Sequence, residues 1–140
     1  YKRQPINDLE YNKFKGKQGM SDFQTVGQQF WEHYYKTIAE NRADLAQLYT
    51  DDSMMTYEGE PLKGAAAIIE KLNALPQISH KVITFDAQPS VGDGIVCMIG
   101  GDLIIEGNEN PVKFAQTFHL QKGGDFGYYC HNDMFRLNYG

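Results

Sequence analysis

The residue that stands out chemically in this sequence is Glu58, a carboxylate at the end of a short apolar stretch. Residues 53–57 have the composition of a strand, and Gly59 follows directly, so Glu58 should stand at a turn. The neighbouring residues form no recognisable pair of nucleophile and base. Such a carboxylate is either an ordinary solvated turn residue or a charge that pairs with a cation of a binding partner.

The other reactive side chains carry no catalytic or metal-binding signature. The four histidines fall on different predicted elements: His33, His80, His119 and His131. Cys97 and Cys130 lie in apolar, strand-like runs and form no C-x-x-C pair, which predicts buried free thiols in a reducing compartment. No P-loop, dinucleotide fingerprint, nucleophile elbow or zinc motif occurs, so we expect neither a cofactor nor a metal.

Size and charge narrow the class of protein. A chain of 140 residues with 41% hydrophobic side chains is sufficient for one domain with a single core. Residues 20–140 hold eight Lys and Arg against sixteen Asp and Glu, a balance that disfavours nucleic acid and anionic membranes. No run approaches the roughly 18 apolar residues of a membrane span. No segment has the apolar centre of a signal peptide, so the default location is the cytosol or the nucleus.

The chain divides into a leader and one domain. Residues 1–19 lack periodicity and read as a disordered leader or a cloning remnant, whereas residues 20–140 form the domain. Ser21 and Gln24 have capping-box spacing, and apolar residues at helical spacing predict a helix that ends near Glu40. A short helix over 42–49, capped by Asn41, and a third helix from residue 64 to 75 should follow.

After Pro76 the apolar period changes from about four to two. Residues 79–88, 95–105, 112–121 and 126–139 predict four strands joined by turns, and Gly100-Gly101 indicates a bulge or a bend in the second of them. Glu58 to Pro61 is predicted to be a turn. The expected fold is α+β, with a curved antiparallel sheet packed around three helices.

Six separated motifs in this order resemble one known family. They are Phe30-x-x-His33-Tyr34-Tyr35, Leu48-Tyr49, Thr56-Tyr57-Glu58-Gly59, Leu62-x-Gly64, Ile69-Glu70-Lys71-Leu72-x-x-Leu75-Pro76 and Asn132-Asp133-Met134-Phe135-Arg136-Leu137. Together they resemble the nuclear transport factor 2 family. The resemblance implies a cone-shaped fold that forms a homodimer through its sheets. It also implies a carrier, not an enzyme, that binds the small GTPase Ran in its GDP form and Phe-x-Phe-Gly repeats of nuclear pore proteins. Such a carrier moves between cytoplasm, nucleus and nuclear pore.

The resemblance also implies roles for particular residues. Glu58 matches an acid on the rim of a cavity that receives an aromatic side chain of Ran, and the loop acids that could complete this rim are Glu106 and Glu109. The candidates for the cavity wall are Tyr34, Tyr57 and Phe135. For pore repeats, Phe23 stands where animal members have a Trp, and Glu40 matches an acid at the end of the first helix.

Two other functions fit a cone-shaped domain. One is an isomerase or dehydratase whose pocket would draw on Asp86, Asp102, His80 and Tyr34, although nothing in the sequence places these residues together. The other is an adaptor that binds only the repeats of another protein. Recovery of a small GTPase with GDP alone would separate the carrier from both.

Overall fold

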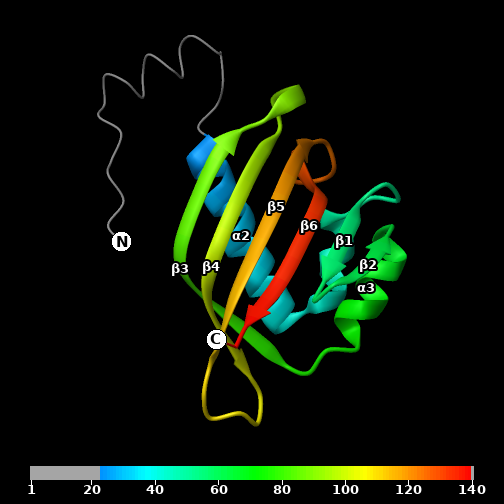
Figure 1. Ribbon diagram of the computed structural model, residues 1–140. Helices are drawn as coiled ribbons and strands as arrows, with labels where there is room; N and C mark the ends of the chain where they lie inside the picture. Colours follow the sequence, from blue (N-terminus) through cyan, green and yellow to red (C-terminus); the bar gives the residue numbers. More distant parts are fainter. Residues whose placement is uncertain (1–22, 140) are drawn as a thin grey trace, which may run out of the picture.

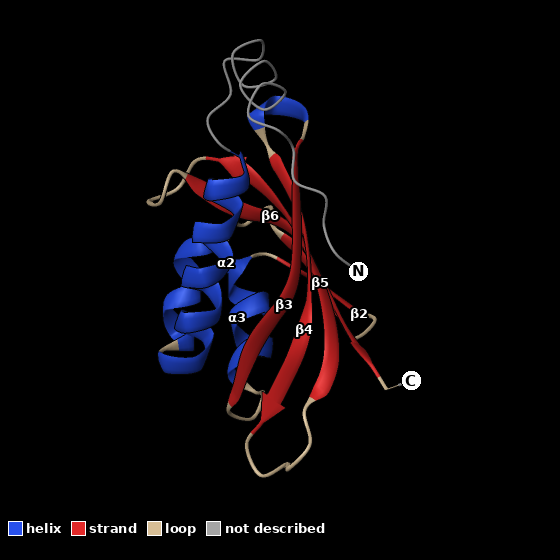
Figure 2. Ribbon diagram, turned by 90° about the vertical axis from the view of Figure 1, so that its left-hand side faces the viewer, coloured by secondary structure: helices blue, strands red, loops and turns tan. Residues whose placement is uncertain are grey.

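The computed structural model describes residues 23–139, which form one layer of helices on one face of a curved sheet (Figures 1 and 2). The helical elements are α2 (Phe23–Glu40), η1 (Arg42–Leu48), α3 (Ala65–Asn73) and the short turn η2 (Val91–Asp93). The strands are β1 (Met54–Tyr57), β2 (Glu60–Lys63), β3 (Ile78–Pro89), β4 (Ile95–Ile105), β5 (Val112–Lys122) and β6 (Tyr128–Asn138). Ser21 and the leader lie outside the described residues. None of the described helices is long and apolar enough to cross a membrane.

The four long strands confirm the predicted antiparallel meander. The sheet has the order β2-β1-β6-β5-β4-β3. All neighbouring strands are antiparallel except β1 and β6, which run parallel with Tyr57 opposite Phe135. The parallel pair brings the end of β1 beside the end of β6.

The predicted turn over Glu58 to Pro61 is too long, because β2 begins at Glu60. A two-residue turn joins β1 to β2, with a positive φ of 52° at Glu58 and 87° at Gly59. Two positive φ angles are typical of the tight hairpin turns that match strand twist. Pro61 is tolerated because β2 is the edge strand, where a missing N–H breaks no ladder.

Helix α2 packs its apolar stripe against the concave face of the sheet (Figure 2). Phe30 and Tyr34 are buried, and both rings contact Phe118 on β5, with centroids 5.4 and 4.9 Å away. Trp31 contacts Phe85 on β3 edge to face at 5.9 Å. These interlocked aromatic rings account for much of the core.

Arg42 fixes η1 to the end of α3. Its guanidinium donates hydrogen bonds to the carbonyl oxygens of Leu72, Leu75 and Pro76 at 2.6–2.7 Å. Carbonyl groups at a helix end have no partner within the helix, so a cation there is doubly favourable. Asn41 stands at the N-cap position of η1, as predicted, but its side chain donates to the Asp44 carboxylate instead of capping a backbone N–H.

The predicted bulge is present opposite Gly100-Gly101. The register between β3 and β4 shifts between Val82 and Thr84, which leaves Ile83 as the additional residue. A Cβ at Gly101 would lie 1.9 Å from the carbonyl oxygen of Lys81. The two backbones are therefore too close for any side chain at this position.

We expect Gly101→Ala to lower the free energy of unfolding by about 1–3 kcal/mol, because the β3 backbone must move to admit the methyl group. Urea denaturation followed by far-UV circular dichroism would measure the change. An unchanged midpoint would show that the two strands are not in this close contact.

Candidate partner-binding site

Glu58 is held in place by the last residues of β6. Its N–H donates to the carbonyl oxygen of Phe135 at 2.9 Å, and its carboxylate accepts a hydrogen bond from the N–H of Leu137. The side chain thus continues the hydrogen-bond ladder between β1 and β6 beyond the end of β1. The carboxylate is exposed and fixed in direction before any partner arrives.

An aromatic stack lies directly beside Glu58. The rings of Tyr57 and Phe135 are parallel within 5° at a centroid distance of 4.6 Å, and Phe135 stacks in turn on Phe114. Phe135 is buried, whereas Tyr57 is partly exposed. Burial, with a smaller effect of the Glu58 charge, raises the pKa of Tyr57 to about 12. A charged residue and an apolar ring therefore lie side by side at the end of β1.

The lysine of α3 beside this stack is already paired. Lys71 of α3 lies 5.8 Å from the centre of the Tyr57 ring and forms an ion pair with Glu60 at 2.9 Å. Three ion pairs join described residues, namely Lys71 with Glu60, Lys113 with Asp102 and Lys122 with Asp93, and Glu58 takes part in none of them. Its charge is therefore available to a partner.

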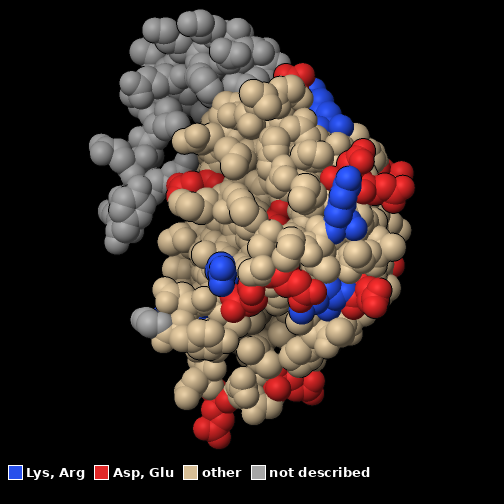
Figure 3. Space-filling view, turned by 45° about the vertical axis from the view of Figure 1, so that its right-hand side comes forward, with Lys and Arg blue, Asp and Glu red and all other residues tan. Residues whose placement is uncertain are grey.

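The loop acids predicted for the rim lie at the same end of the sheet as Glu58. Glu106 and Glu109 are exposed in the hairpin between β4 and β5. This hairpin leads into Lys113, which pairs with Asn138 at the end of β6, so the hairpin and the end of β1 share one edge of the molecule. Figure 3 shows one face of the molecule, which carries more acidic than basic side chains, with acidic side chains also at its lower end.

The two residues predicted to bind pore repeats are far apart. Phe23 and Glu40 are the first and last residues of α2, and 18 helical residues span about 26 Å. A contact residue at Phe23 should be exposed, but its side chain is only 9% exposed. Little of the Phe23 ring is therefore available at the surface, and its role in repeat binding stays a prediction.

Tyr34 belongs to a buried polar network. The Tyr49 hydroxyl lies 2.7 Å from that of Tyr34 and donates to the Asp133 carboxylate, also at 2.7 Å. Gln116 donates to the other carboxylate oxygen at 2.8 Å and accepts from the Tyr35 hydroxyl. The Tyr34 side chain is 1% exposed. It can support the predicted cavity wall from the core, but it cannot contact a partner at the surface.

Sequence reasoning missed Asp133 because its burial depends on a bulge in β6. Leu120 pairs with Cys130 and His119 pairs with Asn132, so His131 is an additional residue in the strand. The bulge allows Cys130 and Asp133 both to face the core, although they are three residues apart. The only available signal was Gln116, a polar residue that alternates with Phe114 and Phe118 along β5.

Burial raises the pKa of Asp133 to about 6, and the hydrogen bonds from Gln116 and the tyrosines oppose this shift. Burial also raises the pKa values of Tyr34 and Tyr49 well above 10 and lowers that of His80 to about 3. The Asp133 side chain is 1% exposed, so no substrate can reach it. The network links α2, β5 and β6 and stabilises their packing. It is not placed to transfer a proton to a substrate.

The raised pKa of Asp133 predicts a pH-dependent stability. The folded state holds this proton more tightly than the unfolded state, whose pKa is near 3.8, so the stabilising contribution is complete below about pH 4. It is lost as the pH rises through about 6, with a total change of roughly 3 kcal/mol. We expect the wild-type protein to lose this amount relative to Asp133→Asn between pH 4 and pH 8.

Urea denaturation of both proteins across this pH range would measure the difference. The amide introduced by Asp133→Asn would keep an acceptor for Gln116 and could donate to the Tyr49 hydroxyl, so the network would remain satisfied. Parallel pH profiles for the two proteins would contradict the assignment.

The residues considered for an enzyme are not brought together. Asp102 pairs with Lys113 at 2.9 Å on the outer face of the sheet, whereas His80 and Tyr34 lie in the core on the other face. Asp86 on β3 lies opposite Met98 on β4. Among residues 23–139, no group of three or more His, Cys, Asp and Glu side chains could hold a metal ion. Cys97 and Cys130 are buried free thiols, as predicted.

The curved sheet wrapped around α2 and the acidic end beside an aromatic stack define the class of cone-shaped α+β domains. The sequence profile of the nuclear transport factor 2 (NTF2) domain matches residues 26–137. The chain therefore belongs to the nuclear transport factor 2 family, and it is a nuclear transport protein, not an enzyme.

Individual relatives agree with this assignment. Nuclear transport factor 2 of Emericella nidulans is 47% identical over 124 residues, which cover 86% of this chain and 98% of that protein. The corresponding protein of Candida glabrata is 46% identical over 121 residues, 84% of this chain and 96% of that protein. The solved structure of nuclear transport factor 2 from Cryptosporidium parvum superimposes with a TM-score of 0.80 at 37% identity, covering 85% of this chain and 97% of that one.

Proposed function

We propose that this protein carries a Ran-type GTPase in its GDP form toward the nucleus and binds Phe-x-Phe-Gly repeats of nuclear pore proteins on the way. The observation that supports this function most directly is Glu58, an unpaired carboxylate held by Leu137 beside the Tyr57–Phe135 stack. A partner that presents one aromatic ring and one cation would find both complements here. Cytoplasm, nucleus and nuclear pore are the corresponding locations.

Each feature has a distinct energetic role in this proposal. Burial of one aromatic side chain contributes about 1.5–3 kcal/mol, and each exposed ion pair contributes about 0–1 kcal/mol. The apolar contact therefore supplies most of the affinity, while Glu58, Glu106 and Glu109 orient the GTPase and accelerate its approach. A carrier of this kind selects GDP if only that state presents the ring and the cation together.

Pull-down with the purified GTPase tests the proposal directly. The full chain, immobilised, should retain Ran loaded with GDP and release Ran loaded with a non-hydrolysable GTP analogue. Equal capture of both nucleotide states would contradict a carrier specific for GDP. Binding of pore repeats without any GTPase would favour the adaptor.

We propose also that the protein forms a homodimer through the outer face of its sheet. Met98 and Met134 are 61% and 53% exposed, and they lie on either side of Thr117 in the register of β4, β5 and β6. Exposed apolar side chains at the centre of a sheet are typical of an interface. Sedimentation equilibrium should give twice the mass of the chain, and a monomer at micromolar concentration would contradict the dimer.

A further inference from the structure

Tyr139 is the most exposed aromatic side chain among residues 23–139. Its side chain is 79% exposed, compared with 51% for Phe126. It follows directly on β6, two residues beyond Leu137, whose N–H donates to the Glu58 carboxylate. A large ring left in water beside a candidate binding site is typical of a residue that a partner covers.

The pairing of β6 places Tyr139 between the two acidic parts of the rim. On one side β6 pairs with β1, whose end leads into the turn at Glu58. On the other side the last residue of β6 pairs with Lys113 of β5. The next residue, Tyr139, therefore lies close to the start of β5 and to the hairpin that carries Glu106 and Glu109.

The Tyr139 side chain is directed to the same side of the sheet as the aromatic stack. Alternate residues of an extended strand share one face, and Phe135 and Leu137 both pack against the core. The electrostatics of Tyr57 agrees with this placement. Burial is the main cause of its raised pKa, and the charges of Glu58 and Tyr139 are among those that raise it further. The Tyr139 hydroxyl thus lies within electrostatic range of Tyr57.

The Tyr57 ring has little free surface for a cation of the partner. It stacks on Phe135 at a centroid distance of 4.6 Å, and the Lys71 ammonium group lies 5.8 Å from its centre. The charge of this lysine would also repel a second cation. Within the part of the chain that the structure describes, no cation lies over the Tyr139 ring. Tyr139 therefore offers an aromatic face that is still available.

The surroundings of this ring favour a cation over an anion. Lys71 and Lys113 at this end of the sheet are each paired with an acid at 2.9 Å. The guanidinium of Arg136 lies against the turn at Gly59. Glu58 takes part in no ion pair with another described residue. The face of an aromatic ring attracts ammonium and guanidinium groups, and the acids of the rim add to this attraction.

We propose that Tyr139 is a further contact residue of the partner site and that its ring face binds a Lys or Arg side chain of the GTPase. This inference rests on the proposed function, because it concerns the same site. Glu58 and the hairpin acids attract the cation, and the ring covers one side of it. A neutral polar group would gain nothing comparable from the ring, so Tyr139 adds discrimination for a partner that carries a cation at this point.

Exchange of the ring tests the proposal. Isothermal titration calorimetry with Ran-GDP would compare the wild-type chain with Tyr139→Phe and Tyr139→Leu. Phenylalanine keeps the ring face, so Tyr139→Phe should bind within about twofold of wild type. Leucine keeps an apolar side chain but has no ring, so Tyr139→Leu should bind about three- to tenfold more weakly.

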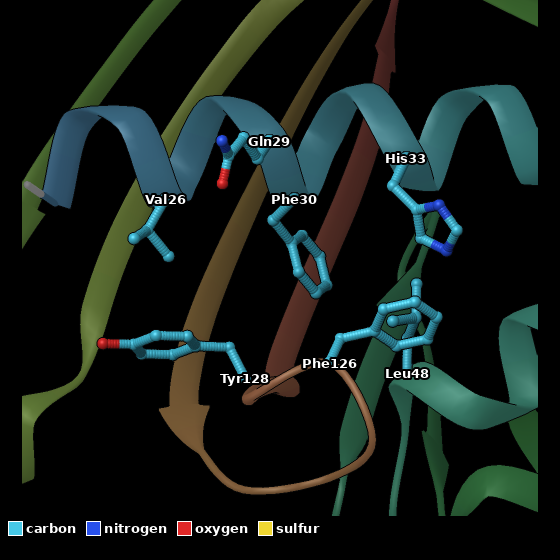
Figure 4. Close-up of a pocket in the computed structure, with 7 residues that line it drawn as sticks. All are labelled: Val26, Gln29, Phe30, His33, Leu48, Phe126 and Tyr128. Atoms are coloured by element: carbon cyan, nitrogen blue, oxygen red, sulfur yellow. The ribbon is translucent and has the colours of Figure 1, made fainter.

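Phe126→Leu is the matched control and should bind Ran-GDP like wild type. Phe126 is also an exposed ring next to an acid, Asp125, but it lies at the opposite end of β6. There it borders a cavity between α2 and the loop that joins β5 to β6 (Figure 4). The residues that line this cavity are Val26, Gln29, Phe30, His33, Leu48, Phe126 and Tyr128.

The outcomes separate this inference from the proposed function. Wild-type affinity in Tyr139→Leu, shown to be folded by far-UV circular dichroism, would overturn the inference and leave the carrier function intact. Equal losses for Tyr139→Phe and Tyr139→Leu would overturn it as well, because they would assign the effect to the hydroxyl group. An equal loss for Phe126→Leu would assign the effect to exposed apolar surface in general. A wild-type chain that does not bind Ran-GDP would overturn the proposed function and this inference with it.

Discussion

Glu58→Lys is expected to weaken binding of Ran-GDP by about 10- to 30-fold while the domain remains folded. The substitution replaces an attraction for the cation of the partner with a repulsion, next to the aromatic stack where the partner must dock. It also removes the acceptor for the N–H of Leu137. Since the position is exposed, the loss of that hydrogen bond should cost no more than about 1 kcal/mol of stability. Isothermal titration calorimetry would measure the affinity.

Two further variants separate the effect of the Glu58 charge from the effects of its hydrogen bond and of the net charge of the protein. Glu58→Gln keeps an acceptor for Leu137 without the charge and should have an intermediate effect. Asp125→Lys makes the same change in charge sign in the loop at the opposite end of β5 and should bind Ran-GDP normally. Equal losses for Glu58→Lys and Asp125→Lys would indicate that net charge alone governs binding.

Asp133→Ala is expected to have the largest effect on stability, a loss of about 2–4 kcal/mol at pH 7. The Tyr49 hydroxyl and the Gln116 amide would each lose a buried acceptor, at a cost of about 1–3 kcal/mol apiece. Removal of the carboxylate, which is mostly ionised at pH 7, recovers part of this cost, because burial disfavours the charge. Urea denaturation would measure the net change.

Asp102→Ala is the matched control for this prediction. Asp102 is also a strand aspartate with a hydrogen-bonded partner, but its pair with Lys113 lies on the outer face of the sheet, where the aspartate is 19% and the lysine 66% exposed. Exposed pairs contribute about 0–1 kcal/mol. Similar losses for the two variants would show that the buried network is not a special source of stability.

The sequence by itself determined most of the secondary structure and the position of Glu58. Helix α2, helix α3 and the four long strands follow from apolar periods that are local, because each period reflects which side of one element faces the core. Gly100-Gly101 indicated an irregularity in the sheet, although the additional residue, Ile83, lies on the neighbouring strand β3. The exposed turn at Glu58 could be predicted from a short apolar run and the glycine that follows Glu58.

The tertiary structure alone decided how these elements combine into sites. The parallel pairing of β1 with β6, which orients the Glu58 carboxylate, joins residues 58 and 137. The burial of Asp133 depends on a register shift in β6, and the cavity under Phe126 depends on how a loop lies against α2. Periodicity describes one element at a time, whereas register and loop placement depend on contacts between distant segments. Those contacts form only when the whole core packs.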